Sequence, residues 1–440
     1  MRKTYQVIEY GSFVRDKEVV GYTSLPQDTF DALENFVLSN SSKDTDALEL
    51  MGLSARKGIG KIITAKNYVG VITMEDGTTI EILPKIYSRE QSTDGKIKKL
   101  LVDMLKTLRN SPYKSLQTTN VNIEKMSIFE VFIRMFIDEV FFIVKRGLKS
   151  SYETIQSNEA VFKGKMKFAG QIRYNYAHKE RCFVEYDEFN LNRAENKLLK
   201  ATLLYLYKNT GSSKNKNDIK TLLNSFTEVD ASVDYDGDFA KIVPDRNTKD
   251  YATALMWSKV FLMGKSFTSF SGSEVAFALL FPMETLFESY IAAQLRKVLS
   301  ISEYSVSAQD RTYHLFDEPS KKFLMKPDLV VKDKMRNITY IMDTKWKVLS
   351  DTKPNYGISQ ADMYQMYAYQ KKYTAENVTL IYPYAERLSS DKVIEFHSQD
   401  GVTVRAKFVD LFDIKNSLNG IVDDFVKEGV CYDDMSRNIL

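Results

Sequence analysis

The sequence predicts a mixed α/β protein with a β-rich start, a helical middle and an α/β region at its end. Residues 1–90 carry β-branched runs around turn residues, and one long apolar run follows at 126–147. From about residue 270 the expected order is helix, strand, strand, strand, helix, strand. A chain of 440 residues has room for two or three domains. We therefore expect regions at 1–110, 111–265 and 270–440.

The first region is expected to be mostly sheet. β-branched residues flank Asp76-Gly77, a pair typical of hairpin turns, and a helix is expected from Asp94-Gly95 through Leu108. The N-terminal residues MRKTYQVIEYGSF lack the apolar stretch of a signal peptide. We therefore expect a cytoplasmic protein.

The middle region is expected to be mainly helical. Its most apolar segment, 128–144, contains the ionisable residues Glu130, Arg134, Asp138 and Glu139. Each would cost roughly 2.5–3.5 kcal/mol at the centre of a bilayer, so we expect a buried helix rather than a membrane span. The polar stretch 211–218, GSSKNKND, predicts an exposed connection between two helices.

The last region is expected to alternate between helices and strands. Helices are expected at 282–299 and 361–373, and strands at 303–316, 323–331, 338–349 and 377–384.

Composition limits the kinds of site that the chain can build. The formal charge of +3 argues against binding to nucleic acid by overall charge alone. The cysteines Cys182 and Cys431 are too few for a disulfide framework or a cysteine zinc site. The three histidines are far apart in the sequence. Any metal is therefore expected to be a hard cation bound by carboxylates.

The most informative residues are Lys326-Pro327-Asp328 and, fifteen positions after Asp328, Asp343-Thr344-Lys345. If the strands around them pair antiparallel, Asp328 and Asp343 lie close together and repel unless a cation sits between them. That arrangement suits Mg²⁺, with Asp328, Asp343 and the Thr344 carbonyl as ligands and Lys345 orienting a water. The reaction implied is hydrolysis of a phosphodiester.

The Asp-x-Lys tripeptide alone is weak evidence. It also occurs at Asp94, Asp218, Asp351 and Asp413, in polar turns or at helix edges without an upstream Pro-Asp strand. There a surface salt bridge is the expected role.

Two helices offer further candidates. Gln365 and Tyr369 are four apart and share a helix face, where they contact substrate or simply pack on the sheet. Glu288, in the middle of the helix at 282–299, either reaches the metal or pairs with a lysine in solvent.

Lys163, Lys165 and Lys167 are expected to alternate along one strand. This stripe would bind the backbone of DNA, face an acidic partner surface, or protect a solvated strand edge.

The segments KPDLVV, YIMDTKWK and YQMYAY resemble the PD-(D/E)xK nuclease core with the Gln-xxx-Tyr helix of its RecB-like branch. The wider chain resembles the McrC family of McrBC-type, modification-dependent restriction systems. Its supporting segments are EILPKIY, FKGKMKFAGQI, YDEFNLNRAENKLLKATLLYL and LFESYIAAQL. The resemblance implies a restriction-endonuclease-like α/β/α domain at 270–440.

The resemblance also implies roles for residues. Asp328 and Asp343 would be metal ligands and Lys345 the catalytic lysine, with Glu288 at the acidic position of the first helix. Gln365 and Tyr369 would match the Gln-xxx-Tyr helix. The cofactor implied is Mg²⁺, with Mn²⁺ as a substitute.

The partners implied are DNA and a hexameric, McrB-like AAA+ GTPase, which the region 1–110 would dock onto and stimulate. Gly264-Lys265-Ser266 mimics a phosphate-binding loop, but Lys259 stands where the motif needs glycine. Cutting two strands favours a homodimer through the nuclease domain. Two alternatives remain: a non-catalytic activator or scaffold of the AAA+ ring, and a stand-alone RecB-like repair nuclease.

Overall fold

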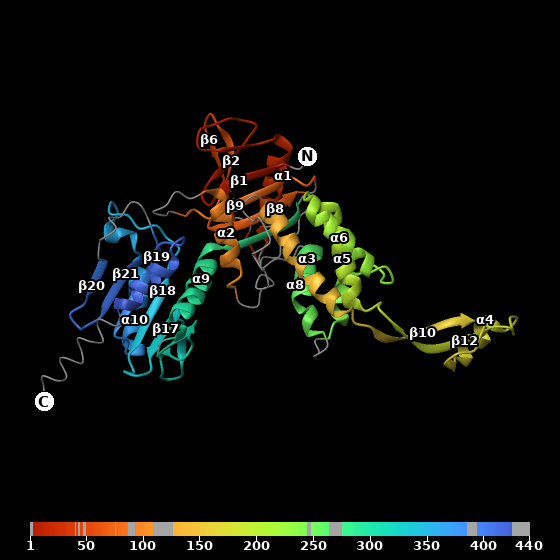
Figure 1. The fold of residues 1–440 in the computed structure, drawn as a ribbon. Coiled ribbons are helices and arrows are strands. Elements are labelled where there is room, and N and C mark those ends of the chain that lie inside the picture. The colour runs from red at the N-terminus through yellow and green to blue at the C-terminus, as the bar shows by residue number, and fades with distance from the viewer. Residues whose placement is uncertain are drawn as a thin grey trace. The chain divides into compact units, whose positions relative to one another are not determined.

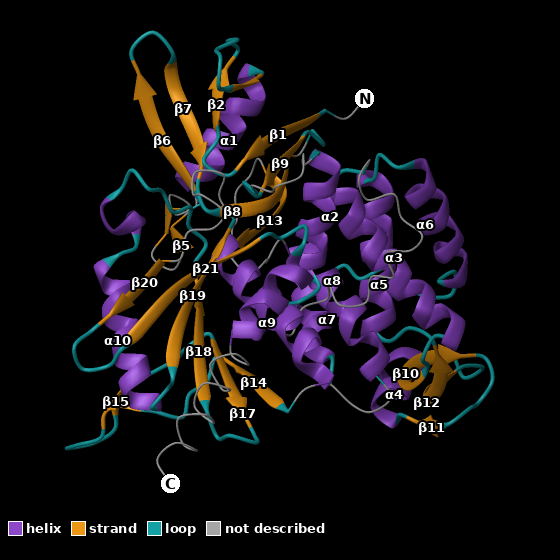
Figure 2. Ribbon diagram, turned by 60° about the vertical axis from the view of Figure 1, so that its left-hand side comes forward, coloured by secondary structure: helices purple, strands orange, loops and turns teal. Residues whose placement is uncertain are grey.

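The computed structural model describes residues 3–39, 41–42, 45–46, 50–74, 76–86, 93–108, 126–243, 248–263, 275–301, 303–384 and 394–424. The chain divides into two compact units. Residues 1–2 and 129–271 form one, called here the helical unit. Residues 3–128 and 272–440 form the other, the sheet unit. Figures 1 and 2 show the elements of both.

The helical unit is built around an aromatic core. Trp257 stacks on Phe261 with ring centres 5.4 Å apart and lies 5.7 Å from the ring of Phe132. Its helices are α3 (Ile128–Arg146), α5 (Ala194–Asn209), α6 (Ser213–Ser225), α7 (Tyr235–Lys241) and α8 (Ala252–Met263), with a 3₁₀ turn η5 (Lys249–Tyr251). As expected, the apolar segment forms a helix, α3, and no described helix is long and apolar enough to cross a membrane.

Ionisable residues of α3 hold its neighbour α6 in place. The Glu130 carboxylate accepts hydrogen bonds from the Thr210 hydroxyl at 2.7 Å and the Asn215 side chain at 2.8 Å. Arg134 pairs with Asp218 on α6. The prediction that 211–218 is only an exposed connection is therefore wrong, because α6 begins at Ser213 and buries Asn215.

The helical unit also carries a β-hairpin with a short helix. Strands β10 (Ser151–Glu159) and β12 (Cys182–Asn190) pair antiparallel, and the two-residue strand β11 (Lys165–Met166) and helix α4 (Phe168–Asn175) lie against β12. Cys182 is a free thiol. Cys431 lies outside the described residues, as does Gly264-Lys265-Ser266.

In the sheet unit, the N-terminal part contains two four-stranded sheets. One has the order β1-β9-β8-β13 and the other β3-β2-β7-β6. The expected turn at Asp76-Gly77 joins β8 to β9, and the Gly77 amide donates to the Met74 carbonyl at 3.0 Å. The strands are β1 (Thr4–Ile8), β2 (Ser12–Arg15), β3 (Thr23–Leu25), β4 (Ser41–Ser42), β5 (Thr45–Asp46), β6 (Met51–Arg56), β7 (Gly60–Ala65), β8 (Tyr68–Met74), β9 (Thr79–Leu83) and β13 (Val275–Pro282). The helices are α1 (Gln27–Ser39) and α2 (Asp94–Leu105).

Strand β13 ties the end of the chain to its beginning. It comes after residue 270 in the sequence, yet it pairs with β8 rather than with the strands that follow it. Gly70 makes this pairing possible: its φ is +142°, and a Cβ there would lie 2.0 Å from the Leu279 carbonyl oxygen. Whether the region 1–110 docks onto a partner stays a prediction.

The rest of the sheet unit is a six-stranded sheet between helices. Its order is β14-β17-β18-β19-β21-β20, with β18, β19 and β21 parallel and the others antiparallel to their neighbours (Figure 2). The elements are α9 (Met283–Val298), η6 (Leu299–Ile301), β14 (Tyr304–Ala308), β15 (His314–Phe316), β16 (Lys322–Leu324), β17 (Leu329–Asp333), β18 (Thr339–Thr344), η7 (Pro354–Gly357), α10 (Gln360–Tyr373), β19 (Asn377–Pro383), β20 (Ile394–His397) and β21 (Thr403–Val409). A further helix begins at 414.

Helix α10 covers one face of this sheet. Ser359 caps its start by accepting a hydrogen bond from the Asp362 amide, and Thr374 ends it with a left-handed φ of +49°. Met366, Tyr369 and Tyr373 pack against inward-facing residues of the sheet, among them Ile341 and Leu380. Because alternate residues of a strand share a face, Asp343 lies on the same face as Ile341. The fold therefore places Asp343 beneath α10.

Candidate functional site

The two aspartates come together at the open end of a β-hairpin. Strands β17 and β18 pair antiparallel with Leu329 opposite Met342. The next residues outward, Asp328 and Asp343, therefore lie opposite each other. This is the pairing that the sequence predicted. The Thr344 amide and hydroxyl both donate to Asp328 Oδ2, at 2.8 and 2.7 Å. Thr344 thus fixes the Asp328 carboxylate against the end of β18.

Both carboxyl groups are costly to ionise where they are. Burial raises the pKa of Asp328, and the hydrogen bonds from Thr344 oppose this only in part. Burial, and then the charge of Asp328, raise the pKa of Asp343 to about 7, although Lys345 acts in the opposite direction. Only 2% of Asp343 is exposed. Two carboxyl groups that repel each other in a buried place can both ionise when a cation sits beside them.

Lys345 pairs with one of these carboxyl groups and with a third. Its Nζ is 2.7 Å from Asp343 Oδ2 and 3.5 Å from Asp362 Oδ1, on the first turn of α10. Burial lowers the pKa of Lys345, but the charges of Asp343, Asp362 and Asp328 outweigh it and the net change is upward. Lys345 is therefore a cation at neutral pH, suited to stabilising negative charge.

Gln365 and Tyr369 meet on α10, as their spacing predicted. The Gln365 side-chain amide donates to the Tyr369 hydroxyl at 2.7 Å. Tyr369 is buried, and this burial together with the charge of Asp343 raises its pKa to about 12. Gln365 itself is exposed. The α10 face above Asp343 therefore presents one amide and one phenol.

Glu288 lies on α9 and is held by Gln309. Glu288 Oε1 accepts a hydrogen bond from the Gln309 side chain at 2.8 Å. The backbone N–H of Gln309 donates to the backbone carbonyl of Asp328, also at 2.8 Å. Among the described residues, no three His, Cys, Asp or Glu side chains are grouped as a metal site. Glu288 is thus connected to Asp328 through Gln309, and its role as a metal ligand stays a prediction.

The donor set fits a hard divalent cation. Asp328 and Asp343 offer oxygen ligands, which Mg²⁺ prefers, and Mg²⁺ commonly keeps several waters beside one or two carboxylates. The Tyr382 hydroxyl is also buried and has no hydrogen-bond partner within the described part of the chain. Burial and the charges of Asp362 and Asp343 raise its pKa. The site therefore combines carboxyl groups that a cation would neutralise with a buried hydroxyl that a water on that cation would hydrogen-bond.

Sequence reasoning missed Asp362 and Gln309. Asp362 lies three residues before Gln365, and this helical spacing was the signal that could have placed it at the site. Gln309 gave no such signal, because it reaches Glu288 and Asp328 only through the pairing of β14 with β17.

The lysine stripe does not form as expected. Only Lys165 lies on β11, whereas Lys167 precedes α4 and Lys163 lies in the preceding turn. Lys167 Nζ pairs with Glu185 at 2.6 Å, and Lys163 Nζ lies 3.7 Å from the ring centre of Tyr186. The three lysines therefore do not alternate along one strand, and a role for them in binding DNA stays a prediction.

Comparisons with known proteins give the family. The family model described as "McrBC 5-methylcytosine restriction system component" matches residues 63–383, well over half of the chain. The chain belongs to the McrBC family. Searching curated proteins gave no significant match to this McrBC-family chain.

Two solved structures share its fold. One is a refined half-complex from a tetradecameric assembly of Thermococcus gammatolerans McrB AAA+ hexamers with bound McrC. The matched chain is 18% identical, with a TM-score of 0.66, and the match covers 95% of this chain and 100% of that one. The other is a cryo-EM structure of the Thermococcus gammatolerans McrBC complex, with 18% identity, a TM-score of 0.50 and coverage of 68% and 88%. The mixed α/β fold expected from the sequence is thus confirmed.

Proposed function

We propose that this McrBC-family chain is the Mg²⁺-dependent DNA endonuclease subunit of a restriction complex. The observation that carries the proposal is the convergence of Asp328, Asp343 and Lys345 at the end of β18, in a site whose carboxyl groups resist ionisation unless a cation is near. Two carboxyl groups held close together, with a lysine on one of them and a helix that carries Gln365 and Tyr369 above, suit hydrolysis of a phosphodiester.

The side chains would divide the work. Asp328 and Asp343 would hold the divalent cation, which when bound lowers the pKa of a water and neutralises charge on a phosphate. Lys345 remains protonated and would stabilise negative charge developing on the phosphate oxygens. Thr344 keeps Asp328 oriented, and Asp362 keeps Lys345 near Asp343. Gln365, exposed beside Tyr369, would contact the backbone of the substrate.

The proposed partner is an AAA+ GTPase of the McrB type. One of the similar Thermococcus structures contains McrB AAA+ hexamers with bound McrC and the other is an McrBC complex, and this supports the same kind of assembly here. We propose that the region 1–110 docks onto the ring and stimulates its GTPase, and that two nuclease domains pair to cut both strands. The alternative of a scaffold without catalysis predicts stimulation of the GTPase and no cutting.

The test is cleavage of modified plasmid DNA by the reconstituted complex with GTP and Mg²⁺. Asp343→Ala removes one of the two proposed ligands and should abolish cutting, while stimulation of the partner's GTPase stays at the wild-type level. The matched control is Asp413→Ala, an exposed aspartate in another Asp-x-Lys tripeptide and outside the proposed docking region, which should cut normally. Cutting by Asp343→Ala at the rate of Asp413→Ala would refute the site, and a wild-type complex that never cuts would favour the scaffold.

A further inference from the structure

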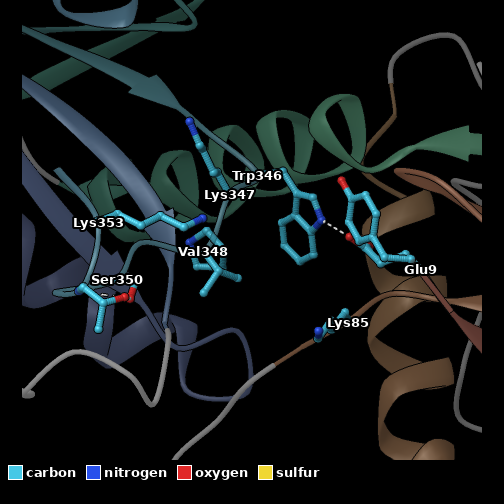
Figure 3. Close-up of a pocket in the computed structure, with 10 residues that line it drawn as sticks. Glu9, Lys85, Trp346, Lys347, Val348, Ser350 and Lys353 are labelled. Atoms are coloured by element: carbon cyan, nitrogen blue, oxygen red, sulfur yellow. Dashed lines mark hydrogen bonds between the residues drawn. The ribbon is translucent and has the colours of Figure 1, made fainter. Parts of the chain in front are cut away.

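A pocket in the sheet unit is lined in part by residues that follow Lys345 in the sequence. It has a volume of about 350 Å³ and opens where β18 and β19 end. It is lined by Glu9, Lys85, Trp346, Lys347, Ser350 and Lys353, among others (Figure 3). Trp346 and Lys347 are the two residues that follow Lys345. Whatever enters this pocket therefore lies within a few residues of the proposed catalytic lysine.

One end of the pocket combines an aromatic ring with a buried acceptor. The Trp346 indole N–H donates to Glu9 Oε1 at 2.8 Å, and its ring packs on Phe287 of α9 with centres 5.3 Å apart. Glu9 is only 2% exposed; its second oxygen, Oε2, is buried without a hydrogen bond of ordinary geometry among the described residues, although the backbone amide and the charge of Lys85 act on this carboxylate. A buried acceptor without a partner costs about 1–3 kcal/mol. A ligand that brings an N–H group would recover that cost.

The remainder of the pocket is basic. Lys85, Lys347 and Lys353 are all exposed at its rim. In the described part of the chain, the ammonium groups of Lys347 and Lys353 form no ion pair, unlike Lys371 and Lys372, which pair with Asp400 and Asp317. Unpaired lysines around one pocket favour a ligand with negative charge.

These features together fit one nucleotide better than any simpler ligand. A phosphate ion alone would leave the indole and Glu9 unused, and an apolar molecule would leave the lysines unused. A nucleotide supplies a phosphate for the lysines, a ring for the aromatic end and a base N–H for Glu9. The volume lies within the range of pockets that bind small molecules.

We propose that this pocket binds one nucleotide of the DNA strand next to the position of cleavage, with its phosphate on Lys347 and Lys353 and its base against the Trp346 ring, beside Glu9. The proposal rests on the proposed nuclease function. A free nucleotide would offer the same groups, but the direct succession Lys345-Trp346-Lys347 favours a nucleotide of the strand being cut. The pocket would hold the strand while Lys345 faces the scissile phosphate.

Trp346 allows binding to be measured without any cutting. The chain has two tryptophans, and Trp257 is fully buried in the helical unit. The full chain is titrated, in EDTA and without the partner, with a single-stranded deoxyoligonucleotide, with GTP and with inorganic phosphate. We expect the oligonucleotide to change the emission with saturation, and the Trp346→Phe variant to lose that change.

Lysine variants test the rim. Lys347→Ala and Lys353→Ala should each weaken oligonucleotide binding by about threefold or more and lower the slope of log K against log salt by about 0.7. The control is Lys334→Ala, an exposed lysine at the turn end of the β17–β18 hairpin, away from the pocket, which should bind like the wild type.

Three results would overturn the proposal. If inorganic phosphate changed the emission as the oligonucleotide does, the pocket would be an anion site only. If GTP bound more tightly than the oligonucleotide, the pocket would be a site for a free nucleotide. If Lys347→Ala and Lys353→Ala bound the oligonucleotide with the wild-type salt dependence, the two lysines would not contact its phosphate. Failure of the proposed function is distinguishable, because binding is measured in EDTA and without the partner, where no cutting is needed. A wild-type chain that binds but never cuts would refute the nuclease and not the pocket.

Discussion

The Asp343→Asn variant should gain stability relative to the wild type as the pH rises, although the substitution removes a proposed metal ligand. The substitution keeps the size of the side chain and removes its charge. In the wild type, burial and the charge of Asp328 raise the pKa of Asp343 from 3.8 to about 7. The folded chain therefore binds this proton more tightly than the unfolded chain does. The contribution of Asp343 to the free energy of unfolding therefore falls as the pH rises from about 4 to about 7.

The size of the effect follows from the two pKa values. A difference of about three between them corresponds to roughly 4 kcal/mol of lost stability at pH 8. At pH 5 the folded carboxyl is protonated and the unfolded one is largely ionised, so the loss is roughly 2 kcal/mol. Packing changes caused by the substitution are the same at both pH values. The free energy of unfolding of Asp343→Asn, minus that of the wild type, should thus rise by roughly 2–3 kcal/mol between pH 5 and pH 8.

Urea unfolding in EDTA measures this difference. Both proteins carry Trp257→Phe, so that the emission of Trp346 reports the sheet unit alone. Glu9, whose pKa burial also raises to about 7, is present in both proteins and cancels. A stability difference that is the same at pH 5 and pH 8, or one that shifts towards the wild type, would refute the reasoning that the two aspartates repel each other in a buried site.

Two further substitutions test the fold and the α10 face. Gly70→Ala should lower the free energy of unfolding by about 3 kcal/mol, since its Cβ would meet the Leu279 carbonyl oxygen. Gly420→Ala is the control: it has open space around it and lies in a helix, so it should be unchanged or more stable by up to about 1 kcal/mol in the same urea titration. Equal stability of the two variants would contradict the close approach of β8 and β13. Tyr369→Phe should slow plasmid cleavage by about ten- to hundredfold without changing stability by more than about 1 kcal/mol, because Gln365 loses the hydroxyl that positions it. An unchanged rate would remove Tyr369 from the site.

Local patterns in the sequence were sufficient to predict the β-hairpin and the helix that build the site. The apolar strands around Asp328 and Asp343 have one register that buries their side chains, and this register brings the two aspartates together. The spacing of Gln365 and Tyr369 places both on one helix face, and Asp76-Gly77 specifies its turn. In each of these cases the residues that determine the structure are close together in the sequence.

Features set by distant contacts were missed. Strand β13 joins β8 across some two hundred residues, and only a glycine at position 70 hints at so close a neighbour. Glu9 reaches Trp346 over a still longer separation, 337 residues. The stretch 211–218 looked like a loop because its polar residues face Glu130 and Arg134 on α3, which no local pattern reveals. The lysine stripe failed because Gly164, with a φ of +68°, bends the chain before β11.

The most direct test of the account is the Mg²⁺ dependence of cleavage by Asp328→Asn in the reconstituted complex. Asp328 and Asp343 are proposed to hold the cation together, so neutralising Asp328 should abolish cutting at every Mg²⁺ or Mn²⁺ concentration, while the partner's GTPase is stimulated as by the wild type. The wild type, stripped with EDTA, should regain full cutting when Mg²⁺ is restored. Cutting by Asp328→Asn at the wild-type rate, or cutting by the wild type in EDTA, would contradict the claim that these two aspartates form a metal-dependent nuclease site.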